Sequence, residues 1–166
     1  MSDDALDLRE LLGKPSAEYP DLPDLPPTAT FYGKLINVET GLSQKKGTPY
    51  FRFNVRLTDP GKDVPEAWLD SVKAAGFSLA DFNVYADMWL TANAMRQFRR
   101  FLDSLGFPTN VRMDEMLKLN PENFNPTDET QELFRGRDVL VRTGAMSERG
   151  TVFRNLDSIA GIKRQG

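Results

Sequence analysis

Residues 50–57, YFRFNVRL, alternate strictly between apolar and polar side chains, and this period of two leaves few folds open to the chain. The large apolar residues are Phe51, Phe53, Val55 and Leu57. The residues between them are Tyr50, Arg52, Asn54 and Arg56. Because successive side chains of a strand point to opposite faces, the segment predicts a β-strand. One face is buried, and the other presents a ring, two guanidinium groups and an amide.

Four more strands are predicted around this one. They are residues 30–39, 83–90, 137–145 and 151–162. In the strand at 83–90, the buried face is expected to hold Val84, Ala86 and Met88. The opposite face is expected to hold Tyr85, Asp87 and Trp89. Gly33 is expected to host a bulge that bends the first strand.

Helices are predicted between the strands. The clearest covers residues 92–105, with Thr91 as its N-cap, Gly106 after its end, and Phe98 and Phe101 in the core. Shorter helices are predicted at 65–75, 113–119 and 128–135. The order strand, strand, strand, helix, strand, strand is that of the oligonucleotide-binding barrel. We therefore predict a mainly β protein, a five-stranded OB-fold β-barrel with helical insertions.

The chain divides into an arm and a domain. Residues 1–27 are acidic and rich in proline, so we expect an extended arm, and residues 28–166 form the OB-fold domain. The arm has two candidate roles. It is either a strap anchored on the barrel by Tyr19, Leu22 and Leu25, or a tethered polyanion that competes for a basic groove.

The composition and motifs of the chain exclude several kinds of functional site. The chain has no cysteine and no histidine, which excludes disulfides and thiolate metal sites and removes the commonest general base. No Walker-type phosphate loop or nucleophile elbow is present. No apolar run is long enough to span a membrane, and the N-terminus lacks the pattern of a secretory signal. We expect a cytoplasmic protein that is not an enzyme, needs no cofactor and does not contact membranes.

The net charge of −3 hides an uneven distribution of charge. Residues 31–57 hold five basic and one acidic residue, and residues 135–166 hold seven and three. The remaining segments are acidic. The positive charge therefore falls on segments predicted to be strands, where a local field can attract a polyanion. Lysine and arginine on a strand surface also serve solubility alone, and that alternative stays open.

Rings interleaved with cations are what a protein needs to hold single-stranded nucleic acid. The rings expected to stack on bases are Tyr50, Tyr85 and Trp89, with Phe153 as a further candidate. The cations expected to meet phosphates are Lys45, Lys46, Arg52, Arg56, Arg142 and Arg149. Lys45 and Lys46 lie between the first two strands, and Arg149 lies between the last two. In an OB-fold, these two loops flank the binding face.

Four segments resemble a family of phage-encoded single-stranded-DNA-binding proteins with an OB-fold. They are LPPTATFYGKLINVE, SQKKGTPYFRFNVRL, MRQFRRFLDSLGFP and LFRGRDVLVRT…RGTVFRNLDSI, and together they cover most of residues 25–162. The resemblance implies sequence-tolerant coating of single-stranded DNA during phage replication or recombination. It also implies that replication or recombination proteins are partners and that no residue is catalytic.

The sequence is also compatible with other functions. Single-stranded RNA is an alternative ligand, because the choice depends on how the site tolerates the 2′-hydroxyl. A protein-binding or virion-associated OB-like module would use the same fold without nucleic acid. A carboxylate-metal nuclease would need acidic clusters, for which Asp114–Glu115 and Asp128–Glu129 are the candidates. The oligomeric state is not predicted.

Overall fold

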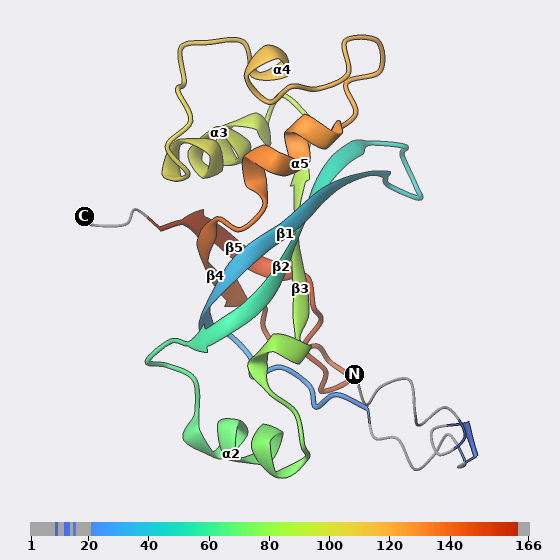
Figure 1. Ribbon diagram of the computed structural model, residues 1–166, viewed down its shortest axis with the longest axis vertical. Helices are drawn as coiled ribbons and strands as arrows, with labels where there is room; N and C mark the ends of the chain where they lie inside the picture. Colours follow the sequence, from blue (N-terminus) through green and yellow to red (C-terminus); the bar gives the residue numbers. More distant parts are fainter. Residues whose placement is uncertain (1–8, 10–11, 14, 16–20, 163–166) are drawn as a thin grey trace.

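A computed structural model describes residues 9, 12–13, 15 and 21–162 of the chain. Five strands form one antiparallel sheet in the order β3-β2-β1-β4-β5 (Figure 1). The strands are β1 (Thr30–Leu42), β2 (Pro49–Pro60), β3 (Asn83–Trp89), β4 (Asp138–Thr143) and β5 (Leu156–Gly161). The helices are α2 (Glu66–Ala74), η3 (Leu79–Asp81), α3 (Met95–Ser104), α4 (Met113–Met116) and α5 (Asp128–Phe134). The protein is mainly β, as predicted.

The alternation in β2 and β3 determines which faces are buried. Phe53, Val55 and Leu57 in β2 have no exposed surface, and Val84 and Met88 in β3 are almost as fully buried. The predicted strand parity is therefore confirmed for both strands. Their polar faces point to the other side of the sheet.

The aromatic core lies where β2 meets the helices. The Phe53 ring packs edge-on against Phe101 and Phe134, with ring centroids 4.9 and 5.1 Å apart, and also contacts Phe98. The four rings come from β2, α3 and α5, so this cluster attaches two helices to the sheet. The prediction that Phe98 and Phe101 belong to the core is confirmed, since each is 2% exposed.

Strand β1 is bent by irregular pairing, and this lets it pair with both β2 and β4. Its register with β2 shifts between Tyr32 and Gly33, as predicted, and again between Leu35 and Asn37. Gly33 is required at the first shift. A Cβ atom there would lie 2.8 Å from the carbonyl oxygen of Arg56 and 2.6 Å from the Val55 side chain. Such bulges increase the local twist and curve the strand.

Two predicted elements begin three or more residues later than expected. The predicted helix 92–105 begins at Met95, because residues 91–94 form a turn in which the Ala94 N–H donates to Thr91 Oγ1 at 3.2 Å. Thr91 thus caps that turn and not the helix. The predicted strand 151–162 begins only at Leu156.

Residues just before β5 instead contact the opposite edge of the sheet. The Tyr85 N–H in β3 donates to the Arg154 carbonyl at 3.0 Å, and Tyr85 and Asn155 form an isolated parallel bridge. Among the residues that the structure describes, this is the single bridge between the two edges, and the sheet remains open. It nevertheless places the β4–β5 loop beside β3.

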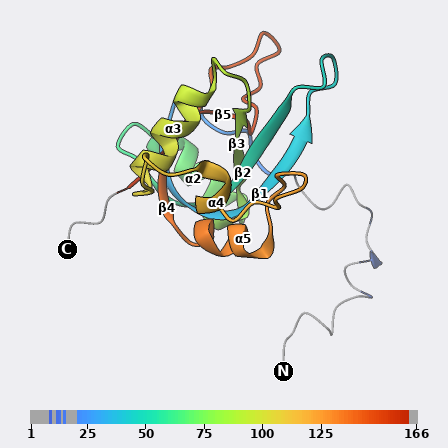
Figure 2. The same ribbon diagram turned by 90° about the horizontal axis from the view of Figure 1, so that it is seen from above.

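The helices occupy opposite ends of the molecule. Helices α3, α4 and α5 lie together at one end of the long axis, and α2 lies at the other (Figure 1). Figure 2 looks onto the α3–α5 end and shows the β1–β2 hairpin projecting beyond the other strands. None of the helices in the described part of the chain is long and apolar enough to cross a membrane.

The end of the predicted arm packs as a strap. Leu25 is 4% exposed, and Leu22 packs against the core. The Trp68 indole N–H donates to the Asp24 carbonyl at 2.7 Å, and Thr143 Oγ1 donates to the Pro26 carbonyl at 2.7 Å. Two of the three predicted anchors are thus in contact with the domain, and the third, Tyr19, lies outside the described residues.

Candidate nucleic-acid interface

The polar faces of β2 and β3 form one surface because the two strands pair in register. Tyr50 lies opposite Trp89, Arg52 opposite Asp87, and Asn54 opposite Tyr85. Strand β1 extends the same rows on the other side of β2. Three aromatic rings from two strands thus share one face of the sheet with one guanidinium group. We call these six residues of β2 and β3 the ring face.

Tyr50 and Trp89 form a ring pair at one end of the ring face. Their centroids are 4.9 Å apart with planes inclined by 60°, and Trp89 is 38% exposed. Both rings keep surface available for stacking on a ligand. Gly41 of β1, opposite Tyr50, makes room for the tyrosine, because a Cβ atom at Gly41 would overlap its ring.

Arg52 occupies the centre of the ring face and is held from two sides. Its Nε and Nη2 donate to the two carboxylate oxygens of Asp87 at 2.8 and 3.1 Å. Its guanidinium carbon lies 3.9 Å from the centroid of the Tyr85 ring and 5.4 Å from that of Tyr50. The hydrogen bonds to Asp87 raise the pKa of Arg52 above its ordinary value, although desolvation opposes them. The group stays charged and fixes the ring beneath it.

This pairing changes the role expected for Arg52. Its charge is matched by Asp87, and Glu39 of β1 lies opposite it on the other side. A matched cation attracts a phosphate less than an unmatched one. Arg52 is therefore better suited to orienting Tyr85 than to contacting the phosphate backbone. Cations at the edges of the ring face must supply most of the attraction.

Lys45 and Lys46 lie at one such edge, in the turn between β1 and β2. The turn is closed by hydrogen bonds from the Ser43 N–H to the Thr48 carbonyl and from the Gly47 N–H to the Ser43 carbonyl, both 2.9 Å long. Gly47 has a φ of 64°, which glycine adopts without strain. Both lysines are exposed, and in the described part of the chain neither has a carboxylate partner. They lie a few residues from Tyr50.

Arg56 lies at the other end of the ring face, opposite Asn83 of β3 and Lys34 of β1. It is exposed, and Lys34 pairs with Asp138 at 3.1 Å. The predicted cations Lys45, Lys46 and Arg56 thus bracket the rings along β2. A polyanion lying along β2 would meet positive charge at both ends of the ring face and aromatic rings between them.

The β4–β5 loop borders the ring face along β3. The bond from the Tyr85 N–H to the Arg154 carbonyl holds this loop beside the strand. Phe153, one residue earlier, is 67% exposed, and Arg149 is exposed in the turn closed by the bond from the Gly150 N–H to the Ser147 carbonyl. The exposed ring of Phe153 is therefore available to a ligand that lies along β3.

Arg142 lies at the opposite end of β1 from the Tyr50–Trp89 pair. It lies on β4 opposite Thr30, at the start of β1, whereas Tyr50 lies opposite Gly41 near the end of β1. Eleven residues of the bent strand β1 separate these positions. Its positive charge instead contributes to lowering the pKa of Asp63, after the hydrogen bonds from Thr30.

The acidic pairs considered as metal ligands have other surroundings. Asp114 accepts hydrogen bonds from the Arg112 guanidinium at 3.2 and 2.7 Å, and these lower the pKa of Asp114. Asp128 and Glu129 lie exposed in the first turn of α5. Within the described residues, no three acidic side chains gather closely enough to hold a metal ion.

Two features of the site could not be found by reading single strands. The Arg52–Asp87 pair and the space that Gly41 leaves for Tyr50 both depend on which residues face each other across strands. Alternation identifies the face but does not give the register. Asp87 was correctly placed on the polar face without its partner being known.

The role of Gly41 gives a testable prediction. Gly41→Ala should displace the Tyr50 ring and weaken binding of a labelled single-stranded oligonucleotide. The effect should be smaller than that of removing the ring, which costs about 1–3 kcal/mol. Gly144→Ala is the matched control, since a Cβ atom there meets only the Asn155 carbonyl oxygen, at 3.8 Å. Equal affinities for the two variants would show that the ring position does not matter.

Comparison with known proteins adds no family assignment, because the sequence matches no protein-family model and no curated relative.

Proposed function

We propose that this protein binds single-stranded DNA with little sequence preference. The observation that supports this most strongly is the ring face, on which Tyr50, Trp89 and Tyr85 share two paired strands with Arg52. The Arg52 guanidinium lies against the Tyr50 and Tyr85 rings. Every base has a π-face, so exposed rings bind bases regardless of sequence, and each stack contributes about 1–3 kcal/mol. Phosphates would meet Lys45, Lys46 and Arg56 at the ends of the ring face, and Arg149 beside it.

The arrangement of the strands supports an OB-fold as part of this proposal. Strand β1 pairs with both β2 and β4, and the Tyr85–Asn155 bridge brings the two sheet edges into parallel contact. An OB-fold is a partly open five-stranded barrel that binds ligands on strands 2 and 3 and on the loops 1–2 and 4–5. The rings and unpaired cations identified above lie at these positions, apart from Arg142.

The biological setting is proposed from the resemblance of the sequence to phage single-stranded-DNA-binding proteins. In that setting, the protein coats DNA strands exposed during phage replication or recombination. Binding would be non-catalytic. Single-stranded RNA would be bound as well if the ring face tolerates a 2′-hydroxyl.

A fluorescence titration with labelled oligonucleotides tests the proposal. We expect a single strand to bind more tightly than a duplex, because only unpaired bases can reach the rings. Affinity should fall steeply with salt, since each phosphate contact releases condensed counterions. Four or five phosphate contacts predict a slope of log K against log salt of about −3 to −3.5, at about −0.7 per contact.

Two results would contradict the proposal. Equal affinity for the duplex would mean that the rings take no part in binding. No binding at low salt would favour the alternative of a protein-binding module, which needs no oligonucleotide. Repeating the titration with an RNA of the same sequence determines which nucleic acid is preferred.

A further inference from the structure

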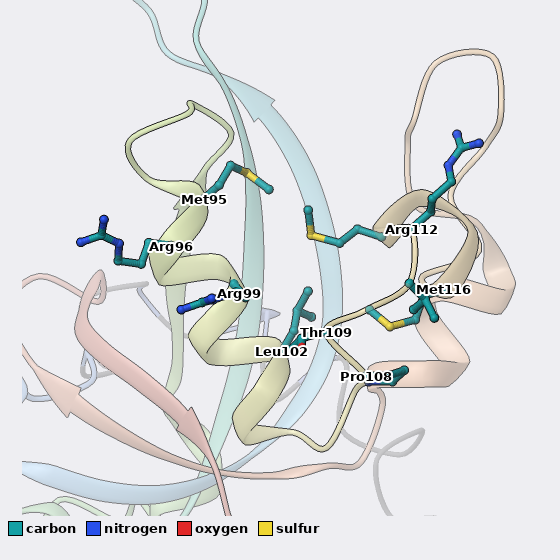
Figure 3. Close-up of a pocket in the computed structure, with 10 residues that line it drawn as sticks. Met95, Arg96, Arg99, Leu102, Pro108, Thr109, Arg112 and Met116 are labelled. Carbon is teal, nitrogen blue, oxygen red and sulfur yellow. The ribbon is translucent and has the colours of Figure 1, made fainter.

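An apolar groove lies between α3 and α4, at the end of the molecule away from α2. It has a volume of about 460 Å³, and Met95 and Leu102 of α3 and Met113 and Met116 of α4 line it. In Figure 3, the Met95 and Met116 side chains point into the space between the two helices. Methionine-lined grooves adapt to apolar side chains of different shapes. We call this feature the α3–α4 groove.

Exposed apolar residues extend the groove beyond these four. Val111 is 48% exposed and Phe124 53%, and Met113 of the lining is itself 37% exposed. A second cavity, lined by Met95, Met113 and Phe124 among others, continues the groove towards β2. An apolar surface of this kind on a protein that is otherwise well packed indicates a docking site.

The charged residues that line the groove between α3 and α4 are all basic. Its charged lining residues are Arg96, Arg99 and Arg112. Arg112 is paired with Asp114 at 2.7 Å, whereas Arg96 and Arg99 have no carboxylate partner among the residues that the structure describes. Both extend from the outer side of α3, away from α4 (Figure 3). The groove therefore suits a segment with an apolar face and an acidic flank.

The chain itself carries such a segment at residues 3–12, DDALDLRELL. It has four acidic residues and one basic residue. On a helix, Leu8, Leu11 and Leu12 share one face at spacings of three and four, which is how helices bind in apolar grooves. The described residues Arg9 and Leu12 are helical, and Leu12 is 81% exposed. A leucine this exposed leaves its apolar surface available to a partner.

The segment is too short to reach the groove of its own domain. Asp24 is held at α2, and α2 and the α3–α4 groove lie at opposite ends of the long axis (Figure 1). From residue 21 back to Leu12, nine residues span at most roughly 32 Å. A domain of this length has a diameter of roughly 37 Å, from a radius of gyration of roughly 14 Å. The path around the surface of such a domain, from α2 to the groove, is about half as long again as this diameter. It therefore exceeds the reach of the nine residues.

We propose that residues 3–12 of one copy bind in the α3–α4 groove of a second copy. The leucines would fill the methionine-lined floor, and the acidic residues would face Arg96 and Arg99. Each copy offers one segment and one groove on different surfaces, so the contact is head-to-tail. Contacts of this kind build open chains of molecules unless they close into a ring. The proposal does not depend on nucleic-acid binding.

Sedimentation velocity without nucleic acid tests it with two variants. The first lacks residues 1–12 and so has only the groove. The second, Met113→Glu, keeps the segment but places a carboxylate in the groove at an exposed position, where it should not disturb folding. We expect the full chain to associate as its concentration rises and each variant to stay monomeric. A mixture of the two variants should form one-to-one dimers, because each supplies what the other lacks.

The control Met146→Glu changes an exposed methionine in the β4–β5 loop and should associate like the full chain. A synthetic peptide of residues 1–13 should bind the truncated protein at least tenfold more tightly than one with Leu8, Leu11 and Leu12 replaced by serine. Three results would overturn the proposal. They are a full chain that stays monomeric, association that survives the truncation, and a mixture of variants that fails to dimerise.

Discussion

Phe53→Ala should lower the free energy of unfolding by about 3–5 kcal/mol, the usual cost of truncating a fully buried phenylalanine. Phe53 has no exposed surface, and its ring contacts three other phenylalanine rings. These rings belong to α3 and α5, so the cavity left by the mutation would weaken the attachment of both helices. Denaturant unfolding followed by circular dichroism measures the change as a shift in midpoint.

Phe153→Ala is the matched control for this prediction. It removes the same atoms from a ring that is 67% exposed, so its effect on unfolding should stay within about 0.5 kcal/mol. A similar loss for both variants would mean that Phe53 is not the centre of the core. The control also informs on function, because Phe153 is a candidate base-stacking ring. Its loss should weaken nucleic-acid binding without affecting stability.

The faces of the central strands could be predicted because they depend on a local property. In residues 50–57 and 83–90, apolar and polar side chains alternate because one side of the sheet is buried. The alternation can be read from the sequence of each strand alone. The bulge at Gly33 was also predictable, since glycine within a strand pattern often marks a bulge or a close backbone approach. These two inferences determine the ring face and the bend of β1.

Pairing between distant segments could not be predicted in the same way. Strand five begins five residues later than its apolar pattern suggests, because the backbone at Arg154 bonds to Tyr85 of β3 and not to β4. The Arg52–Asp87 pair likewise joins residues 35 positions apart. Such contacts depend on register and loop closure, which the pattern of a single strand does not contain. The role of Arg52 changed for this reason, while its position on the polar face did not.

Removing either ring of the Tyr50–Trp89 pair should reduce affinity for a single-stranded oligonucleotide by about 1–3 kcal/mol. This corresponds to roughly 5- to 150-fold in the dissociation constant. Tyr50→Ala and Trp89→Ala should each leave the slope of affinity against salt almost unchanged, because neither removes a charge. Fluorescence anisotropy at several salt concentrations measures both quantities. Circular dichroism should show that the fold is retained, since both residues lie on the solvent side of the sheet.

The double variant tests whether the two rings act as one platform. Their centroids are 4.9 Å apart, so each ring holds the other in place, and losing one already impairs the second. The double loss should therefore be smaller than the sum of the single losses, by about 0.5–1.5 kcal/mol, the worth of an aromatic pair. Strict additivity would mean that the rings bind separate bases independently.

Lys45→Ala combined with Lys46→Ala provides the contrasting result. It removes two charges and no ring, so the salt slope should become less steep by about 1.4, at about 0.7 per phosphate contact. The two kinds of variant therefore separate stacking from charge on one protein. If the ring variants changed the salt slope and the lysine variants did not, the ring face would not be where the bases bind. If neither kind altered binding of the folded protein, nucleic acid would have to bind elsewhere, and the arginines of α3 would be the next residues to test.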